Sequence, residues 1–331
     1  MLLLAVESSC DETAAAVLED GVARSSVVST QVEVHAPYGG VVPELASRNH
    51  ALTIVPVIQQ AFTDAGVTPR QLDAVAATYG PGLIGSLLVG LQAAKGLAYA
   101  LKLPFLGVNH LEGHLAAIHL HEDVPYPYVG LLCSGGHTAL YLVEGVGKAR
   151  LLGETRDDAA GEAFDKTAKL AGLGYPGGAV MDALAAQGDP RRYKLPRALP
   201  GKTNLEFSFS GIKTAARLVV EKEGPLTDQA LKDYCASVRQ AIVEVLCKKA
   251  LAACRLHGAP RLVLAGGVAA NALLRELSVQ MGQQVGVTVH VPPRVLCTDN
   301  AAMIGRAAYH RLMRGERSPL TLDADASARL G

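Results

Sequence analysis

With 331 residues the chain is longer than most single hydrophobic cores, which indicates about two domains. Lysine plus arginine equals aspartate plus glutamate at 31 each and tryptophan is absent, so the chain has neither the basic excess of a dedicated nucleic-acid binder nor an aromatic platform for stacking bases. Its six cysteines form no C-x-x-C pair, which favours a reducing, intracellular compartment.

The first residues predict a buried strand. They read MLLLAVESSCDE, a short apolar run with no basic lead and with Glu7 and Asp11 close behind it. This is neither a secretory signal nor a transit peptide. No apolar run approaches the roughly 20 residues of a membrane span. We therefore expect a cytoplasmic protein with no membrane contact.

Two segments about 125 residues apart share one pattern. Residues 2–26 and 128–152 each begin with an apolar run, pass through a small polar turn and close with a glycine–valine hairpin. The turn is Ser8 to Cys10 in one segment and Ser134 to Gly136 in the other. A period of this length matches a duplicated domain better than a solenoid repeat.

Strands alternate with helices after each hairpin. Residues 71–101 and 260–281 both read as an apolar strand, a glycine turn and a helix, and such helix starts attract anions. The alternation predicts α/β architecture, with two similar lobes and a cleft between them. The last helix is expected at about 299–314, and 188–206 reads as an irregular excursion.

The segment HLEGH at 110–114 raises the question of a metal site. On a helix, His110 and His114 lie one turn apart and face the same way, as two imidazoles on one metal would. In the protease motif H-E-x-x-H the glutamate directly follows the first histidine, whereas Glu112 is turned to the far side of the helix. The peptidase reading therefore fails, and two surface or interfacial histidines are the alternative.

Asp299 is the candidate third ligand. It stands between a predicted strand and a predicted helix, at a corner where function gathers in α/β folds. The commoner role for an aspartate there is the helix N-cap. Two histidines and one carboxylate with open positions favour iron(II) or zinc over magnesium.

Several residues of the second lobe suit a nucleotide. The turn at 134–136 can bring backbone amides close to a phosphate, or it is an ordinary hairpin turn. Asp165 and Asp182 can bind ribose hydroxyls or an amino group, or they are solvated helix charges. The Asn271 amide suits a nucleobase, or it caps a helix.

Two further groups have open roles. Asp11 and Glu12 lie at the tip of the first hairpin, where a carboxylate can take a proton or simply form a turn. The densest cationic cluster can contact RNA phosphates or be a solvated loop. Its members are Arg191, Arg192, Lys194, Arg197 and Lys202.

Together these motifs closely resemble the bacterial TsaD family of tRNA-modifying enzymes. The matching stretches run in order from residue 7 to residue 305 and are ESSCDET, HAPYGGVVPELASRNH, GPGLIGSLLVG, NHLEGH, CSGGHT, DDAAGEAFDKTAKLAGLGYPGG, FSFSGIKT, LAGGVAAN and CTDNAAMIG. The resemblance implies the actin-like ATPase (ASKHA) superfold, with two RNase-H-like lobes and a central cleft. It places the first lobe at 1–108, completed by a C-terminal helix at 300–325, and the second at 109–299 with insertions.

The resemblance also implies a reaction and its site. A family member transfers the threonylcarbamoyl group from threonylcarbamoyl-AMP to N6 of the adenosine 3′ of the anticodon, in tRNAs that read codons beginning with A, and releases AMP. His110, His114 and Asp299 are then the ligands of one divalent metal, iron(II) or else zinc, and Asp11 and Glu12 lie near the transferred group. The adenylate-binding set is Leu132, Cys133, Ser134, Gly135, Gly136, Asp165, Gly178, Asp182 and Asn271.

Partners and one departure follow from the same resemblance. The family is expected to work with a non-catalytic paralogue, which pairs through the first lobe, and with a small P-loop ATPase. Residues 44–63 can form part of such a surface. Archaeal and eukaryotic relatives carry a tyrosine metal ligand where this chain has Cys133, so the fourth ligand here can be a thiolate, water or the substrate.

Three other functions are alternatives to this one. A metallopeptidase is suggested by the paired histidines and opposed by the position of Glu112. A small-molecule kinase of the same superfold usually carries an acidic magnesium site rather than a histidine pair. A non-catalytic scaffold is expected to lack the histidines, which this chain keeps.

Overall fold

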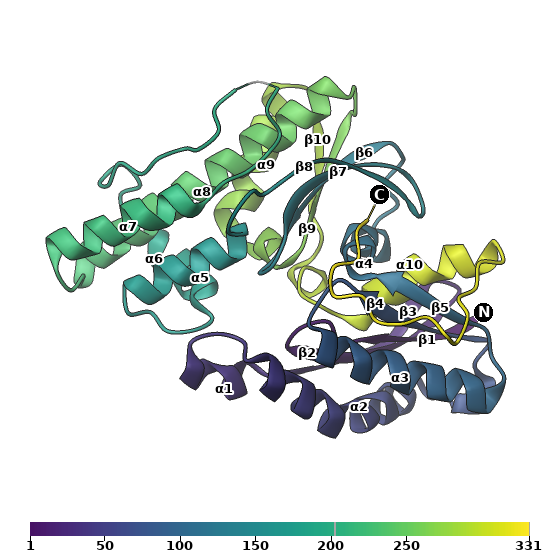
Figure 1. The fold of residues 1–331 in the computed structure, drawn as a ribbon. Coiled ribbons are helices and arrows are strands. Elements are labelled where there is room, and N and C mark those ends of the chain that lie inside the picture. Colours follow the sequence, from purple (N-terminus) through teal and green to yellow (C-terminus); the bar gives the residue numbers. More distant parts are fainter. Residues whose placement is uncertain (202, 331) are drawn as a thin grey trace. The chain divides into compact units, whose positions relative to one another are not determined.

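The computed structural model describes residues 1–201 and 203–330, and it divides the chain into two compact units (Figure 1). The first unit comprises Met1–Val124, Gly145–Ala149 and the chain from Thr298 onward. The second comprises Pro125–Glu144 and Arg150–Cys297. The lobe extents that the family resemblance implies, 1–108 and 109–299, stay a prediction.

The chain forms two five-stranded mixed sheets of the same topology. The strand order is β3-β2-β1-β4-β5 in the first sheet and β10-β9-β6-β7-β8 in the second. In each sheet the first two strands are antiparallel, the fourth strand pairs in parallel with the first, and the fifth pairs in parallel with the fourth. The repeat and the α/β class expected from the sequence are thereby confirmed.

The strands of the first sheet are β1 Leu2–Glu7, β2 Glu12–Glu19, β3 Val22–Thr30, β4 Ala74–Gly80 and β5 Phe105–Asn109. Those of the second sheet are β6 Tyr128–Cys133, β7 Thr138–Gly145, β8 Lys148–Glu154, β9 Arg261–Ala265 and β10 Thr288–His290. The helices of the first unit are α1 Val32–His35, α2 Pro43–Ala65, α3 Ile84–Leu101, α4 His110–Ala116 and α10 Ala301–Met313. Those of the second unit are α5 Ala160–Leu170, α6 Gly177–Ala185, α7 Ser210–Glu223, α8 Asp228–Leu256 and α9 Ala272–Gln284.

Helices cover both faces of the first sheet (Figure 1). Leu4 and Val6 of β1 belong to one core cluster, with α2 and α3. Leu3 and Ala5 point the other way and pack with α10. A central strand buried on both faces reads as a continuous apolar run, which explains the opening residues of the chain.

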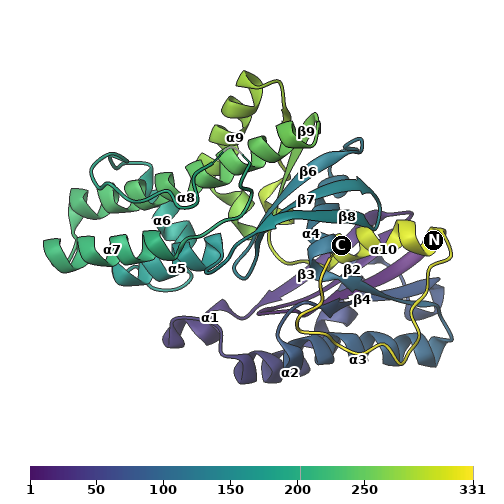
Figure 2. The same ribbon diagram turned by 45° about the horizontal axis from the view of Figure 1, so that its top comes forward.

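The second unit has one large core. Val129 and Leu131 of β6 pack there with Tyr234 and Leu246 of the long helix α8. Helices α5 and α6 close the same core, beside α8 (Figure 2).

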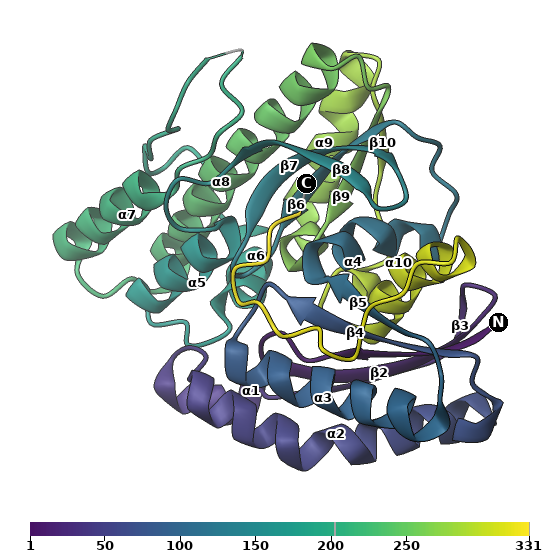
Figure 3. The same ribbon diagram turned by 45° about the vertical axis from the view of Figure 1, so that its right-hand side comes forward.

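The last helix is shorter than the resemblance implied. It ends at Met313, and the expectation of a helix to 325 is wrong. Gly315, at φ +86°, takes a left-handed conformation that ends the helix. The following segment passes along β4 and β5 (Figure 3), where Ser318 N donates to Phe105 O at 2.8 Å and Asp325 N to Tyr79 O at 2.8 Å.

The excursion at 188–206 has neither helix nor strand in the residues described there, 188–201 and 203–206, as expected.

Helix α3, with 18 residues, is long and apolar enough to cross a membrane by length and composition, although the sequence expectation recognised no such run. This is weak support for a membrane span, because core helices pass the same test, and α3 packs Leu87 and Leu91 against the sheet and α2.

Candidate functional site

Strand β5 leads directly into the helix that carries the two histidines. The Asn109 side chain accepts a hydrogen bond from Leu111 N at 2.9 Å and so caps α4. His110 is the first residue of α4 and His114 lies one turn further on, with exposed fractions of 5% and 1%. The two side chains therefore lie on one buried face of the helix, and the alternative of two surface histidines is wrong.

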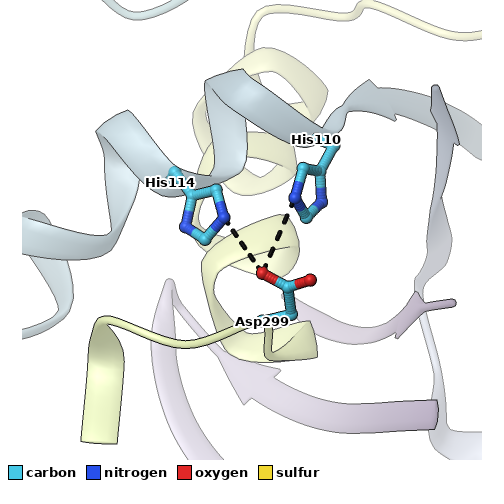
Figure 4. Close-up of side chains that lie close together, drawn as sticks. All are labelled: His110, His114 and Asp299. Atoms are coloured by element: carbon cyan, nitrogen blue, oxygen red, sulfur yellow. Dashed lines mark ion pairs between the residues drawn. The ribbon is translucent and has the colours of Figure 1, made fainter. Parts of the chain in front are cut away.

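Asp299 faces both histidines from the chain that precedes α10. Asn300, not Asp299, caps α10, because its side chain accepts a hydrogen bond from Met303 N at 2.9 Å. The N-cap alternative for Asp299 is therefore wrong. Asp299 Oδ1 lies 3.1 Å from His114 Nε2 and 3.6 Å from His110 Nε2 (Figure 4).

The three side chains fit one divalent cation. One ligand atom from each lies within 4.8 Å of the others. Both ring nitrogens of His114 are buried and make no hydrogen bond, although Nε2 lies close to Asp299. Two imidazoles with one carboxylate suit iron(II) or zinc.

Glu7 contacts Nδ1 of His110, the ring nitrogen opposite the Nε2 atom that faces Asp299. Its Oε2 lies 3.1 Å from His110 Nδ1, and Ser9 Oγ lies 3.1 Å from the same nitrogen. Glu7 is fully buried and also accepts hydrogen bonds from Ser9 N and the Thr78 hydroxyl. Metal-binding histidines commonly pass their second N–H to a carboxylate. The sequence interpretation missed this role, although a glutamate at the end of an apolar strand was a signal for it.

The site holds protons when no cation is present. Burial lowers the pKa of His110, but the charges of Glu7 and Asp299 outweigh it and raise that pKa to about 9. Burial, Asp11 and Asp299 together raise the pKa of Glu12 to about 10. A cation must therefore displace protons from this cluster.

Asp11 and Glu12 lie at the tip of the β1–β2 hairpin, where the sequence placed them. Both are half-buried, and Glu12 begins β2. The Thr30 hydroxyl donates to Glu12 Oε1 at 3.4 Å. Ser9, two residues before Asp11 in the same turn, has its Oγ 3.1 Å from His110 Nδ1, so this turn lies beside the histidine–aspartate cluster.

In the second unit, the turn after β6 is tight and closely packed. Ser134 N donates to His137 O at 2.8 Å, which confirms a hairpin turn. A Cβ atom on Gly161 would lie 2.5 Å from Ser134 O, and one on Gly266 would lie 2.4 Å from Cys133 O. Glycine is therefore required at both positions, because the start of α5 and the end of β9 approach the turn backbone to backbone.

Asp165 and Gly178 meet at the start of α6. Asp165 Oδ1 accepts hydrogen bonds from Gly177 N at 2.9 Å and from Gly178 N at 3.1 Å. The carboxylate on α5 thus binds the first turn of α6. It is not the solvated helix charge that was the alternative.

Asp182 joins α6 to α8 and α9. Its Oδ1 pairs with Arg239 Nη1 at 2.8 Å, and its Oδ2 accepts from Ala272 N at 2.9 Å. Asn271 caps α9, since its side chain accepts from Leu274 N at 3.0 Å. Contacts thus run from the turn at 134–136 through α5 and α6 to the start of α9, so the structure brings together within one unit the residues that the family resemblance assigns to adenylate binding.

The Cys133 side chain is poorly suited to bind a metal as a thiolate. Its side chain is completely buried in the core of the second unit with Leu131 and Leu140. Burial raises the pKa of its thiol far above the ordinary value. Among residues 1–201 and 203–330, the histidine–aspartate cluster is the one group suited to hold a metal, and Cys133 is not part of it.

Glu112 points away from the cluster, as the spacing predicted. Its Oε2 pairs with Arg311 Nη1 at 2.9 Å. Burial raises the pKa of Glu112 in spite of the opposing charge of Arg311. A carboxylate in this position cannot serve as the base of a peptidase.

The cationic cluster at 191–202 is partly neutralised within the chain. Arg197 pairs with Glu244 at 3.2 Å, and Arg191 with Asp189 at 3.5 Å. Lys202 lies outside the described residues. Contact with RNA at this loop stays a prediction.

Solved structures with this arrangement define the class of fold. Full-length HypF in its phosphate- and nucleotide-bound form aligns with 95% of this chain at a TM-score of 0.62 and 14% identity, and this chain spans about half, 47%, of that one. The activator of 2-hydroxyisocaproyl-CoA dehydratase from Clostridium difficile aligns over 96% of this chain and 99% of its own, at a TM-score of 0.56 and 12% identity. The chain therefore shares the α/β fold of these two proteins.

Sequence comparison then gives the family. The family model described as TsaD, tRNA N6-adenosine threonylcarbamoyltransferase, matches residues 23–306. A curated relative of that name from Anaeromyxobacter dehalogenans (strain 2CP-C) is 57% identical over 331 residues, which cover 99% of each chain. The chain belongs to this family of tRNA-modifying transferases. Membership favours a transferase over the peptidase, kinase and scaffold alternatives.

Proposed function

We propose that this chain transfers the threonylcarbamoyl group from threonylcarbamoyl-AMP to N6 of the adenosine 3′ of the anticodon and releases AMP. The acceptors are tRNAs that read codons beginning with A. The observation that carries the proposal is the buried cluster of His110, His114 and Asp299 in a chain of this family. The reaction is expected to take place in the cytoplasm.

The histidine–aspartate cluster is proposed to hold one divalent cation, iron(II) in preference to zinc. When bound, such a cation acts as a Lewis acid toward a carbonyl or carboxylate oxygen of the substrate. Glu7 fixes the His110 ring so that Nε2 faces the site. Asp11 and Glu12 are proposed to hold or accept a proton near the transferred group, because both follow Ser9 in the turn that contacts His110.

The adenylate is proposed to bind at the turn after β6. Gly135 and Gly136 are exposed, their φ angles lie outside the left-handed region, and a Cβ on either would meet nothing within 4 Å. Neither packing nor backbone conformation within the chain therefore requires glycine there. The close approach of a ligand to the two backbone amides would require it, as in anion-binding loops.

The remaining members of the set shape that site. Asp165 and Asp182 hold the starts of α6 and α9, and Gly178 is held by Asp165. Leu132, buried at the end of β6, and Asn271 complete the proposed surroundings of the nucleotide. Because the carboxylates and Asn271 already make internal hydrogen bonds, we assign them chiefly to fixing the backbone amides and helix ends that meet the ligand.

Positioning must supply much of the acceleration. The exocyclic amine of adenine is a weak nucleophile. Holding it next to the transferred carbonyl makes the reaction effectively unimolecular and so lowers the entropic part of its barrier. The target adenosine lies in a loop, and presenting its base costs less unstacking than in a duplex.

A paralogue is proposed to dock on the first unit. Helix α2 exposes Leu52 and Val55, at 76% and 55%, and α3 exposes Ile84 at 50%. Apolar side chains in such numbers on neighbouring helices suit a partner protein. A small P-loop ATPase is the second expected partner.

The test is a reconstituted transfer assay. Purified protein and its partners are incubated with threonylcarbamoyl-AMP and unmodified tRNA, and the nucleosides are analysed by mass. We expect threonylcarbamoyladenosine and an equal amount of AMP. A tRNA with guanosine in place of the target adenosine is the matched control and should stay unmodified. Absence of the product with the intact tRNA, or equal product from the control, would contradict the proposal.

A further inference from the structure

Glu112 and Gly113 of HLEGH face α10 rather than the candidate metal centre. Glu112 Oε2 accepts a hydrogen bond from Arg311 Nη1 at 2.9 Å, and the two side chains are only 11% and 21% exposed. This ion pair joins the short helix α4 to Arg311, near the end of α10.

Gly113 makes the second contact. A Cβ on Gly113 would lie 2.6 Å from Ile304 Cδ1 and 3.2 Å from Met303 Cγ. Ile304 and Met303 are completely buried, so neither side chain has free space to move into. The backbone of α4 therefore touches the first turn of α10 where only glycine fits.

These contacts control the geometry of the metal ligands. His110 and His114 are carried by α4, and Asp299 directly precedes Asn300, the cap of α10. The separation between the imidazoles and the carboxylate is thus the separation between the two helices. Helix α4 has only 7 residues, too few to be stable without tertiary contacts.

The two contacts are spaced along α10. Ile304 lies in its first turn and Arg311 near its end, about 10 Å further along the axis at 1.5 Å per residue. Adjacent residues of α4 thus contact two different turns of α10.

We propose that Glu112 and Gly113 are positioning residues that hold α4 against α10 at the separation at which His110, His114 and Asp299 share one cation. The inference rests on the proposed function in one respect, that the cluster binds a metal ion. Glu112 and Gly113 are neither metal ligands nor catalytic residues, and this inference gives them a role in positioning the ligands. A role in folding alone would affect stability and leave cation affinity in the folded protein unchanged.

The chain offers matched variants. Glu112→Gln keeps the shape of the side chain and removes its charge. Gly113→Ala adds the methyl group that meets Ile304, and Ile304→Val in the same chain removes the atom it meets. Glu316→Gln is the control, because Glu316 is the other partner of Arg311, at 2.8 Å, and does not touch α4.

The experiment titrates each metal-free protein with Co²⁺, whose visible absorption reports its coordination, and records the urea unfolding midpoint in parallel. We expect Glu112→Gln and Gly113→Ala to bind Co²⁺ about tenfold to a hundredfold more weakly while fully folded. Gly113→Ala with Ile304→Val should return to the affinity of Ile304→Val alone. Glu316→Gln should bind like the wild type.

The possible failures are distinct. Wild-type affinity in both Glu112→Gln and Gly113→Ala would overturn the inference alone, whatever their unfolding midpoints. A wild-type protein that binds no cation would overturn the candidate metal centre, and the inference with it. If Glu112→Gln does not fold, the pair of Gly113 variants still decides, because alanine is a better helix former than glycine and favours folding of α4.

Discussion

Cation affinity at the candidate centre should depend steeply on pH. His110 in the metal-free protein carries a proton at neutral pH, because Glu7 and Asp299 raise its pKa to about 9 against the opposing effect of burial. A cation can bind this ring only after the proton leaves. We therefore expect affinity to rise about tenfold per pH unit between pH 7 and 9, in step with the fraction of neutral His110.

The size of the effect follows from the pKa. The change from the ordinary value of 6.5 to about 9 corresponds to about 3 kcal/mol, at about 1.4 kcal/mol per pKa unit. Because the folded-state pKa lies above the unfolded one, this stabilisation of the metal-free protein is complete below pH 6.5 and is lost as the pH rises through about 9. Close to pH 9 the rise falls below tenfold per unit, because part of His110 is then already neutral.

Calorimetric titration with Zn²⁺ at pH 7, 8 and 9, in buffers of different ionisation enthalpy, measures both affinity and proton release. Glu7→Gln removes the charge beside His110 Nδ1 and should release fewer protons. Glu19→Gln, at an exposed pair with Arg24, is the control and should behave like the wild type. A wild-type affinity that stays constant from pH 7 to 9 would refute this reasoning.

Four further substitutions test other parts of the structure. His114→Ala should remove the bound metal, measured by elemental analysis, and lower the rate of transfer at least about a hundredfold. Substituting a residue that only hydrogen-bonds to a metal ligand already lowers metal affinity or activity by up to that factor. Asn300→Ala should cost about 1 kcal/mol of unfolding free energy in urea, because α10 loses its cap. Asp182→Asn should cost about 2 kcal/mol in the same assay and weaken AMP binding, because it leaves the buried Arg239 without its carboxylate. Cys133→Ala should cost about 1 kcal/mol and leave the metal content unchanged, since its thiol belongs to the core; loss of metal in that variant would restore the thiolate as a ligand.

Local patterns in the sequence were enough for the fold class and part of the site. Apolar runs ending in glycine turns predicted β4–α3 and β9–α9, and the repeated hairpin predicted a duplicated domain, which the two sheets of the same topology confirm. The spacing of His110 and His114 placed both imidazoles on one helix face. These features depend on residues close in sequence, which is why they could be recognised.

Contacts between distant residues could not be recognised in this way. Glu7 and His110 are 103 positions apart, and Glu112 and Arg311 are 199 apart. Asp299 and Asn300 are adjacent and both suit a helix cap, so only the fold decides that the asparagine caps α10 and the aspartate stays available as a ligand.

The end of the chain shows the same limit. The extension of the last helix to 325 was carried over from the family resemblance rather than read from the residues. Its actual end is set by Gly315 and by the pairing of Ser318 with the edge strand β5. An edge strand that needs a partner is visible only once the sheet is known.

The central claim is that one cation is shared by His110, His114 and Asp299, and anomalous X-ray scattering from crystals of the metal-loaded protein tests it most directly. We expect one strong peak per chain at the absorption edge of the added metal, in contact with all three side chains. A peak elsewhere in the chain, or none beside the two imidazoles, would contradict the account.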